Sequence, residues 1–222
     1  MTAVEIDIWS DLHCPWAFIA VHRLRRARDE LGLDVVLVPR AWPLEWVNSL
    51  GTPRGIVTTE TAALASHEPD LFGAFAGDSW PSTFMPAFEL VAAARRVQGV
   101  RVAEEVDYAL RLAFFRHGVD VSILAGLQRA LELAHDLRPD VDGQRIQDAW
   151  LTATTRTDVA EDYRISKTLP IQGSPQIFWP DGSTTHNPGM TDHHWVNGLV
   201  RIGPTDPQEP GRLLASHVRG EL

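Results

Sequence analysis

The only cysteine of this 222-residue chain lies where an apolar strand pattern gives way to a helical pattern, within Trp9–Ala17. Val4–Trp9 alternates apolar and polar residues, which predicts a half-buried strand. Pro15–Leu31 carries apolar residues at near-helical spacing and is followed by a glycine, which predicts a helix. Asp34–Val38 predicts a second strand. The chain therefore opens with a strand–helix–strand unit that places Cys14 at the N-terminus of the helix.

The position of Cys14 favours thiol chemistry, because the dipole and the free N–H groups of a helix N-terminus stabilise a thiolate. In a Cys-x-x-Cys motif the second cysteine would occupy position 17, which is Ala17 in this chain. A single chain therefore cannot form a dithiol redox centre, whereas single-thiol chemistry remains open. The alternative interpretation is a thiol kept as a small core residue.

The composition excludes several classes of partner. The net charge is −9 and no long basic run is present, which argues against a nucleic-acid or anionic membrane surface and favours small-molecule or thiol substrates. The sequence shows neither a signal peptide nor an apolar segment of roughly 20 residues, so we expect a cytoplasmic protein in which the thiol stays reduced. A single lysine among many arginines indicates a GC-rich, bacterial genome.

The middle of the chain differs in character from both ends, because residues 55–150 contain helical patterns and no convincing strand. We therefore expect a helical insertion of residues 55–150 in a domain made of residues 1–54 and 151–222. The expected helices of the insertion include Ala87–Val97, Val102–Arg116 and Ile123–Leu137.

The C-terminal part predicts a helix over Asp158–Leu169 and then a hairpin. Gln176–Trp179 and Thr184–His186 are its two strands, joined by a turn of proline, aspartate, glycine and serine. A last helix is expected to begin at Thr191 or Asp192, both of which are good N-cap residues. Residues from 210 onward would form one more short helix or a frayed tail.

Two short motifs carry a resemblance to a known family. Cys14-Pro15-Trp16-Ala17 opens the first helix, and Gly173-Ser174-Pro175 precedes the hairpin. With this element order the chain resembles the DsbA-like branch of the thioredoxin-fold superfamily, and it looks closest to the FrnE-like proteins described as dithiol-disulfide isomerases. Kappa-class glutathione transferases and 2-hydroxychromene-2-carboxylate isomerases are relatives. The resemblance implies an α/β, thioredoxin-like fold with an all-helical insertion.

The resemblance also implies roles for individual residues. It makes Cys14 the nucleophile and Pro175 a cis proline beside it, with the backbone of Ser174 facing the active site, where it could pair with a peptide-like ligand. An ordinary trans proline at the start of an edge strand is the alternative. The kappa-class and isomerase relatives use a hydroxyl in place of the cysteine and activate a bound glutathione. This chain lies between the two patterns.

His13 and Trp16 flank the thiol and are further candidate catalytic residues. His13 could stabilise the thiolate or move a proton, and Trp16 could shield the thiol or stack on a substrate. Each has a simpler interpretation: a solvated histidine at a turn, and a tryptophan packed against the insertion.

Thr191 and Asp192 are candidates for binding the γ-glutamyl carboxylate of glutathione, which the resemblance places at a loop and helix start at this point. N-capping of the expected helix without any ligand explains them equally well. The histidines at 13, 186, 193 and 194 match no zinc-binding spacing, so we expect surface histidines and no metal.

Three functions follow, none of which requires a tightly bound cofactor. In the first, Cys14 is the nucleophile of a monothiol oxidoreductase that uses glutathione or another low-molecular-weight thiol as co-substrate. In the second, a transferase-like or isomerase-like enzyme uses Cys14 to activate a bound thiol without attacking anything. In the third, the chain is a non-catalytic binding protein, which predicts a buried Cys14 with a normal or raised pKa. The oligomeric state is not predicted.

Overall fold

The main sheet joins the two ends of the chain. The structure is a computed structural model that describes residues 3–51, 53–75, 77 and 80–219. Its main sheet has the strand order β2-β1-β3-β4, in which β1 and β2 are parallel and the other pairs are antiparallel. These strands are β1 (Val4–Ser10), β2 (Val35–Ala41), β3 (Gln176–Phe178) and β4 (Thr184–His186). Because β3 pairs with β1, the segment around Pro175 is brought beside the loop that carries Cys14.

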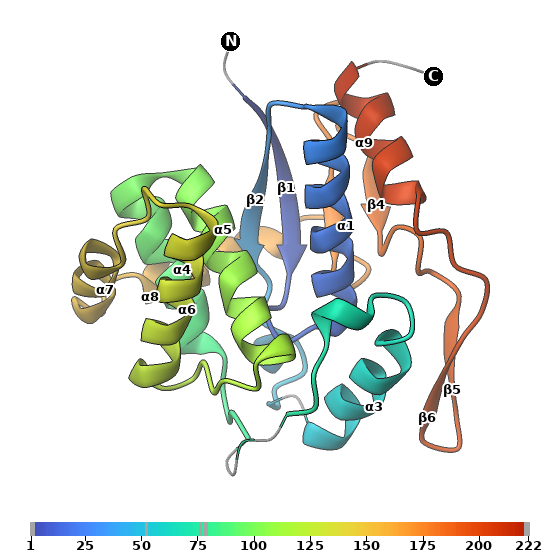
Figure 1. Cartoon of the computed structure of the whole chain (residues 1–222), viewed down its shortest axis with the longest axis horizontal. Coiled ribbons are helices and arrows are strands. Elements are labelled where there is room, and N and C mark those ends of the chain that lie inside the picture. The colour runs from blue at the N-terminus through green and yellow to red at the C-terminus, as the bar shows by residue number, and fades with distance from the viewer. Residues whose placement is uncertain (1–2, 52, 76, 78–79, 220–222) are drawn as a thin grey trace.

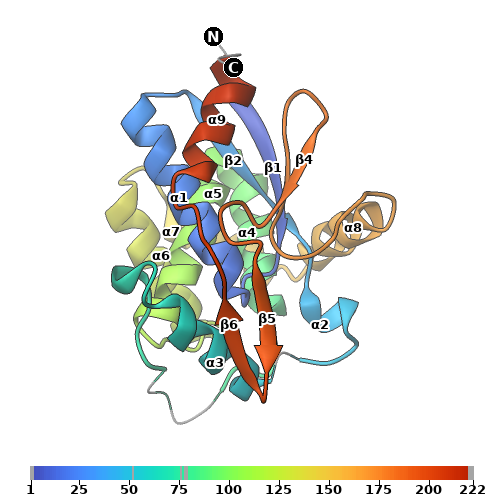
Figure 2. The ribbon, with the colours of Figure 1, turned by 90° about the vertical axis from the view of Figure 1, so that its right-hand side faces the viewer.

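Helix α1 (Pro15–Leu31) has the bounds that the sequence predicts. Pro15 opens it where no intrahelical N–H is needed, and Gly32 ends it in the left-handed conformation with φ of 61°. Helix α9 (Glu209–Arg219) runs alongside α1, as both ribbon views show (Figure 1 and Figure 2). The close approach of the two helices is possible because Gly211 faces Ala27.

Between β2 and β3 the chain is helical, as predicted. Figure 1 shows most of these helices gathered on the β2 side of the sheet, where α5 packs against β2. They are α2 (Leu44–Val47), α3 (Arg54–Leu64), the short 3₁₀ turn η1 (Pro69–Leu71), α4 (Met85–Gln98), α5 (Val100–Arg111), the π-helical turn η2 (Leu112–Arg116), α6 (Leu124–Leu137), α7 (Gly143–Leu151) and α8 (Arg156–Ser166). The domain boundaries at residues 54/55 and 150/151 remain a prediction.

The prediction of a helix from Thr191 or Asp192 is wrong. Residues from His193 form a second, two-stranded sheet of β5 (His193–Val196) and β6 (Leu199–Ile202). Asn197 and Gly198 turn between the strands with φ of 50° and 74°, the positive values that a two-residue hairpin turn requires. The turn chemistry therefore overrides the capping signal, and the last helix is α9, near the position where one of the two alternatives placed it.

No helix among the described residues has the length and apolar character needed to cross a membrane.

Candidate functional site

Asp11 organises the loop between β1 and α1. Its carboxylate accepts the backbone N–H of His13 at 2.5 Å and that of Leu44 at 2.6 Å. Its own backbone N–H donates to Ser174 Oγ at 2.9 Å, and its carbonyl accepts the N–H of Cys14 at 3.3 Å. Burial raises the pKa of Asp11 to about 6, although these N–H groups and the charge of Arg111 act in the opposite direction. The hydrogen bonds of Asp11 thus hold Cys14 beside the segment that precedes β3.

Arg111, on α5, holds the same loop in place. It is 1% exposed and forms an ion pair with Asp107, one turn earlier on α5, with its Nε 2.8 Å from Oδ2. It also donates to Ser10 Oγ at 2.8 Å and to the carbonyl of Asp11 at 3.0 Å. The buried guanidinium therefore ties the end of β1 to the helical insertion.

Cys14 is the N-cap residue of α1, and its thiol points at the segment of Ser174 and Pro175. The Cys14 Sγ lies 3.3 Å from the Ser174 carbonyl, to which the thiol donates, and the Ser174–Pro175 peptide bond is cis. The two motifs that are 160 residues apart in sequence thus meet at the sulfur atom. This is the juxtaposition that the resemblance implies.

Burial acts against the predicted stabilisation of a thiolate at Cys14. Burial raises the pKa of the Cys14 thiol to about 12, and the nearby carboxylates of Glu60 and Asp11 add to the effect. Hydrogen bonds with Ser174 and the backbone of Ala17 act in the opposite direction without reversing it. Cys14 is only 6% exposed, so the loss of hydration outweighs the effect of the helix N-terminus.

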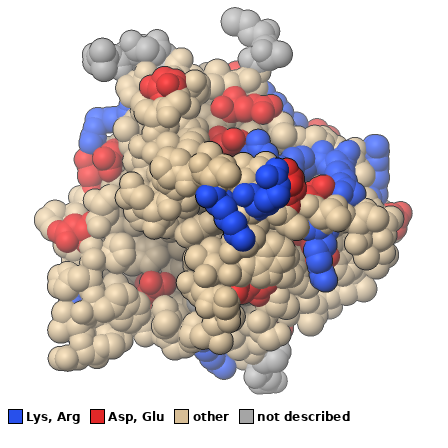
Figure 3. Space-filling view, turned by 180° about the vertical axis from the view of Figure 1, so that it is seen from behind, with Lys and Arg blue, Asp and Glu red and all other residues tan. Residues whose placement is uncertain are grey.

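A cleft of about 440 Å³ opens beside Cys14. One wall is the start of α1, the second is formed by α2 and the chain that leads to Ile56 and Glu60 on α3, and the third contains Gly173, Ser174, His186, Asn187 and His193. Figure 3 shows the face of the molecule on which α2 lies. This face is hollowed, and the surface around the hollow consists largely of residues other than Lys, Arg, Asp and Glu. Three separate parts of the sequence therefore surround the thiol.

Several polar atoms at this cleft are buried and lack a hydrogen-bond partner among the described residues. They are His13 Nε2, Asn187 Oδ1 and His193 Nδ1. His13 is 4% exposed and Asn187 1%, so water does not readily replace the missing partners. Buried polar groups are normally paired, so these three atoms are available to a water molecule or to a polar ligand.

His13 is not solvated at the turn, which was its simpler interpretation. Its ring stacks on Phe84 with centroids 4.1 Å apart and lies within 5.3 Å of the rings of Trp80 and Phe114. Burial lowers its pKa to about 3, so the imidazole is neutral at physiological pH. Electrostatic stabilisation of a thiolate by a protonated His13 is therefore excluded in this state, whereas hydrogen bonding through Nε2 remains available.

Trp16 forms part of the cleft and contacts α3, which lies within the predicted helical insertion, so its packing against the insertion and a role in the cleft are compatible. Its ring stacks on His193 with centroids 4.2 Å apart, and its side chain hydrogen-bonds to Glu60. Trp16 thus connects the β5–β6 hairpin and α3 above the thiol.

Thr191 and Asp192 are exposed and do not line the cleft. They lie in the segment between β4 and β5, outside any helix or strand, so no helix N-terminus is present at which they could bind a carboxylate. The positions that do face the cleft are His186, Asn187 and His193, of which the sequence analysis placed the two histidines on the surface. Among the described residues, no group of three potential ligands is arranged to hold a metal ion.

Comparisons with known proteins identify the fold. No protein-family model and no curated protein matches the sequence. Among solved structures, a candidate protein disulfide isomerase from Nitrosomonas europaea matches with a TM-score of 0.65 and 16% identity over 96% of each chain. The cytosolic disulfide reductase DsbM from Pseudomonas aeruginosa, solved with GSH, matches with a TM-score of 0.62 and 16% identity over 97% of this chain and 100% of DsbM.

A candidate DsbA oxidoreductase from Streptomyces coelicolor matches with a TM-score of 0.63 and 17% identity, covering 98% of this chain and 91% of that protein. At these identities the matches describe a shared architecture. The chain thus has the thioredoxin-like fold with a helical insertion that is found in DsbA-like proteins.

Proposed function

We propose that this chain is a thiol oxidoreductase of monothiol type, in which an external low-molecular-weight thiol such as glutathione reacts at Cys14. The observation that carries the proposal is the cleft, which brings the lone thiol together with Ser174 and the unpartnered polar atoms of His13 and Asn187. DsbM, a cytosolic reductase with the same fold, is solved with GSH, which supports the choice of thiol and a cytoplasmic setting.

The chemistry balances without a second protein cysteine. The Cys14 thiol loses its proton, and its sulfur attacks one sulfur of a small disulfide, so that a mixed disulfide forms and one thiol molecule is released. An external thiol then attacks the mixed disulfide, which regenerates the Cys14 thiol and releases a new disulfide. In one cycle half of the small disulfide leaves as a thiol, the external thiol takes its place in the new disulfide, and the protein is unchanged.

A second candidate is favoured by the raised pKa of Cys14. A thiol that stays protonated at neutral pH can donate its S–H to the sulfur of a bound thiolate, which is the role that a hydroxyl plays in the isomerase-like hypothesis. In that case Cys14 orients the external thiol and forms no bond to it. The non-catalytic hypothesis also expects a buried thiol with a raised pKa, but it gives no reason for unpartnered polar atoms at an open cleft.

The three hypotheses are separated by comparing the wild type with Cys14→Ser and Cys14→Ala. Each protein is incubated with oxidised glutathione and its intact mass is measured, and reduction of a small disulfide by glutathione is assayed in parallel. The monothiol mechanism predicts one glutathionyl adduct on the wild type and no activity in either variant. The isomerase-like mechanism predicts no adduct and binding of glutathione that survives in Cys14→Ser.

Binding of glutathione is measured by calorimetry in the same three proteins. If the wild type neither forms an adduct nor binds glutathione, both enzymatic hypotheses are wrong and the non-catalytic one remains.

A further inference from the structure

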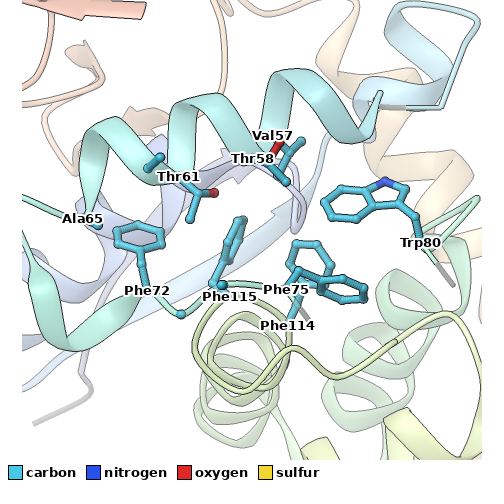
Figure 4. A pocket seen from close by; sticks show the side chains of 12 residues that line it. Val57, Thr58, Thr61, Ala65, Phe72, Phe75, Trp80, Phe114 and Phe115 are labelled. Atoms are coloured by element: carbon cyan, nitrogen blue, oxygen red, sulfur yellow. The ribbon is translucent and has the colours of Figure 1, made fainter. Parts of the chain in front are cut away.

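A second cavity of about 330 Å³ lies on another face of α3. Figure 4 shows it from close by: α3 forms one wall, and a row of aromatic side chains forms the opposite wall. The row consists of Phe72 and Phe75 from the loop after η1, Trp80 from the segment before α4, and Phe114 and Phe115 from η2. The aromatic cavity, as we call this space, is as large as cavities that bind small organic molecules, which begin at about 300 Å³.

Among the described residues, those that line the aromatic cavity carry no charged side chain. The α3 wall contributes Val57, Ala65 and two threonines. The hydroxyl of Thr58 donates to the carbonyl of Arg54 at 2.9 Å within the helix, whereas the hydroxyl of Thr61 has no hydrogen-bond partner among the described residues. A cavity with so few polar groups holds water poorly and favours an apolar occupant. The hydroxyl of Thr61 is available for one polar contact with such an occupant.

The aromatic wall is held in place by the backbone. The N–H of Gly73 donates to the carbonyl of Phe115 at 2.8 Å, which fixes the loop after η1 against η2. A Cβ atom at position 73 would lie 2.6 Å from the carbonyl oxygen of Arg116, so only glycine permits this approach. The π-helical turn itself places Phe114 and Phe115 side by side, with centroids 4.8 Å apart, and such turns occur frequently at functional sites.

Several rings of this wall meet edge to face, and the Arg54 guanidinium lies 5.9 Å from the Phe75 centroid and 5.7 Å from the Trp80 centroid. Phe75 and Trp80 meet nearly perpendicularly at 5.0 Å, and Trp80 and Phe114 do so at 5.4 Å. Such arrangements extend readily to one more ring, because aromatic groups prefer edge-to-face and offset contacts. A flat aromatic occupant therefore gains more from this wall than a saturated one of equal size.

The aromatic cavity is separate from the Cys14 cleft. Val57 and Thr61 face the cavity, whereas Ile56 and Glu60 on the same helix face the cleft. Among the described residues of the cleft, His13 is the one whose ring contacts rings of the cavity wall, tilted against Trp80 and edge to face with Phe114. The proposed thiol chemistry does not require the cavity.

We propose that the aromatic cavity is a binding site for an uncharged, planar aromatic molecule with about two fused rings and one hydroxyl or N–H group directed at Thr61. The inference rests on the volume and chemistry of the cavity and does not depend on any activity of Cys14.

The test uses 2-naphthol as the probe and isothermal titration calorimetry as the measurement, on the full chain and on Cys14→Ser. We expect a dissociation constant on the order of 0.1 mM, as is typical of a well-fitting molecule of this size. 2-Decalol, its saturated counterpart, should bind at least about fivefold more weakly, as should the anion 2-naphthoate.

Variants locate the bound probe. Ala65→Phe adds a ring at the end of the cavity beside Phe72 and should weaken binding at least about tenfold, whereas Ser66→Phe adds the same ring to the exposed neighbouring position and should change nothing. Thr61→Val keeps the shape and should weaken binding about threefold through the lost hydroxyl, with Thr59→Val as its control.

Far-UV circular dichroism verifies the fold of each variant. Should Ala65→Phe fail to fold, ring-current shifts of the Val57 and Thr61 methyl signals of the wild type, recorded by NMR during titration, replace it. Binding that Ala65→Phe leaves unchanged, methyl signals that do not move, or tighter binding of 2-naphthoate than of 2-naphthol would each overturn the proposal.

Discussion

The two cavities beside α3 differ in almost every respect except size. The Cys14 cleft has a buried thiol and polar atoms without partners, and its walls come from three distant parts of the chain. The aromatic cavity has an uncharged lining and a wall of rings that already contact one another. The cleft therefore resembles a site whose buried polar groups remain unsatisfied until a ligand arrives, whereas the cavity is stable when empty and gains from any matching apolar molecule.

One segment supports both cavities. Arg111, the last residue of α5, anchors the loop that carries Cys14, and the next five residues form η2 with its two phenylalanines. A change in this segment is therefore expected to affect both cavities, whereas changes at their outer walls should affect one of them.

The largest effect concerns the reactivity of the thiol. With the pKa of Cys14 raised from 9.0 to about 12, the thiolate fraction at neutral pH falls about a thousandfold. Alkylation by iodoacetamide should be slower in the native protein than in the urea-unfolded protein by about that factor. The native rate should keep rising about tenfold per pH unit up to at least about pH 11. Intact-mass spectrometry over a time course measures both rates.

Cys14→Ser serves as the blank in this experiment, since it has no thiol to alkylate. A native rate that levels off near neutral pH would show a stabilised thiolate and would remove the main chemical contrast between the cleft and the aromatic cavity.

The next largest effect is expected from Arg111→Met. The substitution leaves the Asp107 carboxylate buried without its partner and releases Ser10 Oγ and the Asp11 carbonyl. Loss of one member of a buried ion pair typically costs about 3 to 5 kcal/mol, so the free energy of unfolding should fall by about 3 kcal/mol or more. Urea denaturation measures the change.

The double variant Asp107→Leu/Arg111→Met is the matched control, because it removes both charges. It should recover a large part of the lost stability. If the double variant is as unstable as the single variant, the loss of stability comes mainly from the hydrogen bonds to Ser10 and Asp11 and not from the unpaired charge.

Sequence reasoning predicted the parts of the site that depend on local pattern. The bounds of α1, the strand–helix–strand opening and the meeting of Cys14 with Ser174 and Pro175 follow from periodicity, from proline and glycine positions and from the family resemblance. Local signals suffice for the bounds of α1 and for the strand–helix–strand opening, whereas the meeting of two motifs 160 residues apart follows from the resemblance.

The errors have two physical causes. Asn197-Gly198 between short apolar runs is a strong hairpin signal. The helix prediction relied on the capping residues before this turn and did not take the turn into account. The direction of the Cys14 pKa could not follow from local sequence, because it depends on burial under α3 and on the Glu60 carboxylate. Likewise, His186 and His193 reach the cleft only through the pairing of β3, β4 and the β5–β6 hairpin, which no local pattern specifies.

A smaller effect, confined to the aromatic cavity, is expected from Gly73→Ala. Its Cβ would meet the carbonyl oxygen of Arg116 at 2.6 Å, so the loop after η1 must move away from η2. We expect a loss of about 2 kcal/mol in the free energy of unfolding and weaker binding of 2-naphthol, with glutathione binding unchanged. Gly55→Ala is the control: nothing lies within 4 Å of its Cβ, and alanine in α3 should stabilise slightly. Equal losses in both variants would argue against a prebuilt aromatic wall.

The smallest effect is expected at the hairpin wall of the Cys14 cleft. His193→Ala removes the ring that stacks on Trp16 at 4.2 Å, an interaction worth about 0.5 to 1 kcal/mol. Because Trp16 also hydrogen-bonds to Glu60, loss of the stack should loosen the hairpin and leave the fold intact. We expect the melting temperature to fall by about 2 °C and the KM for glutathione to rise about threefold, with kcat unchanged.

His194→Ala is the matched control for this variant, since His194 is the next residue of β5, is exposed and does not line the cleft. His194→Ala should alter neither the melting temperature nor the KM for glutathione. A rise in KM for His193→Ala alone would show that the hairpin contributes to ligand binding, in contrast to the aromatic cavity, whose wall is complete without it. Equal effects of the two substitutions would instead indicate a general loosening of β5, and the cleft would then have to be built by α1, α3 and the segment around Ser174.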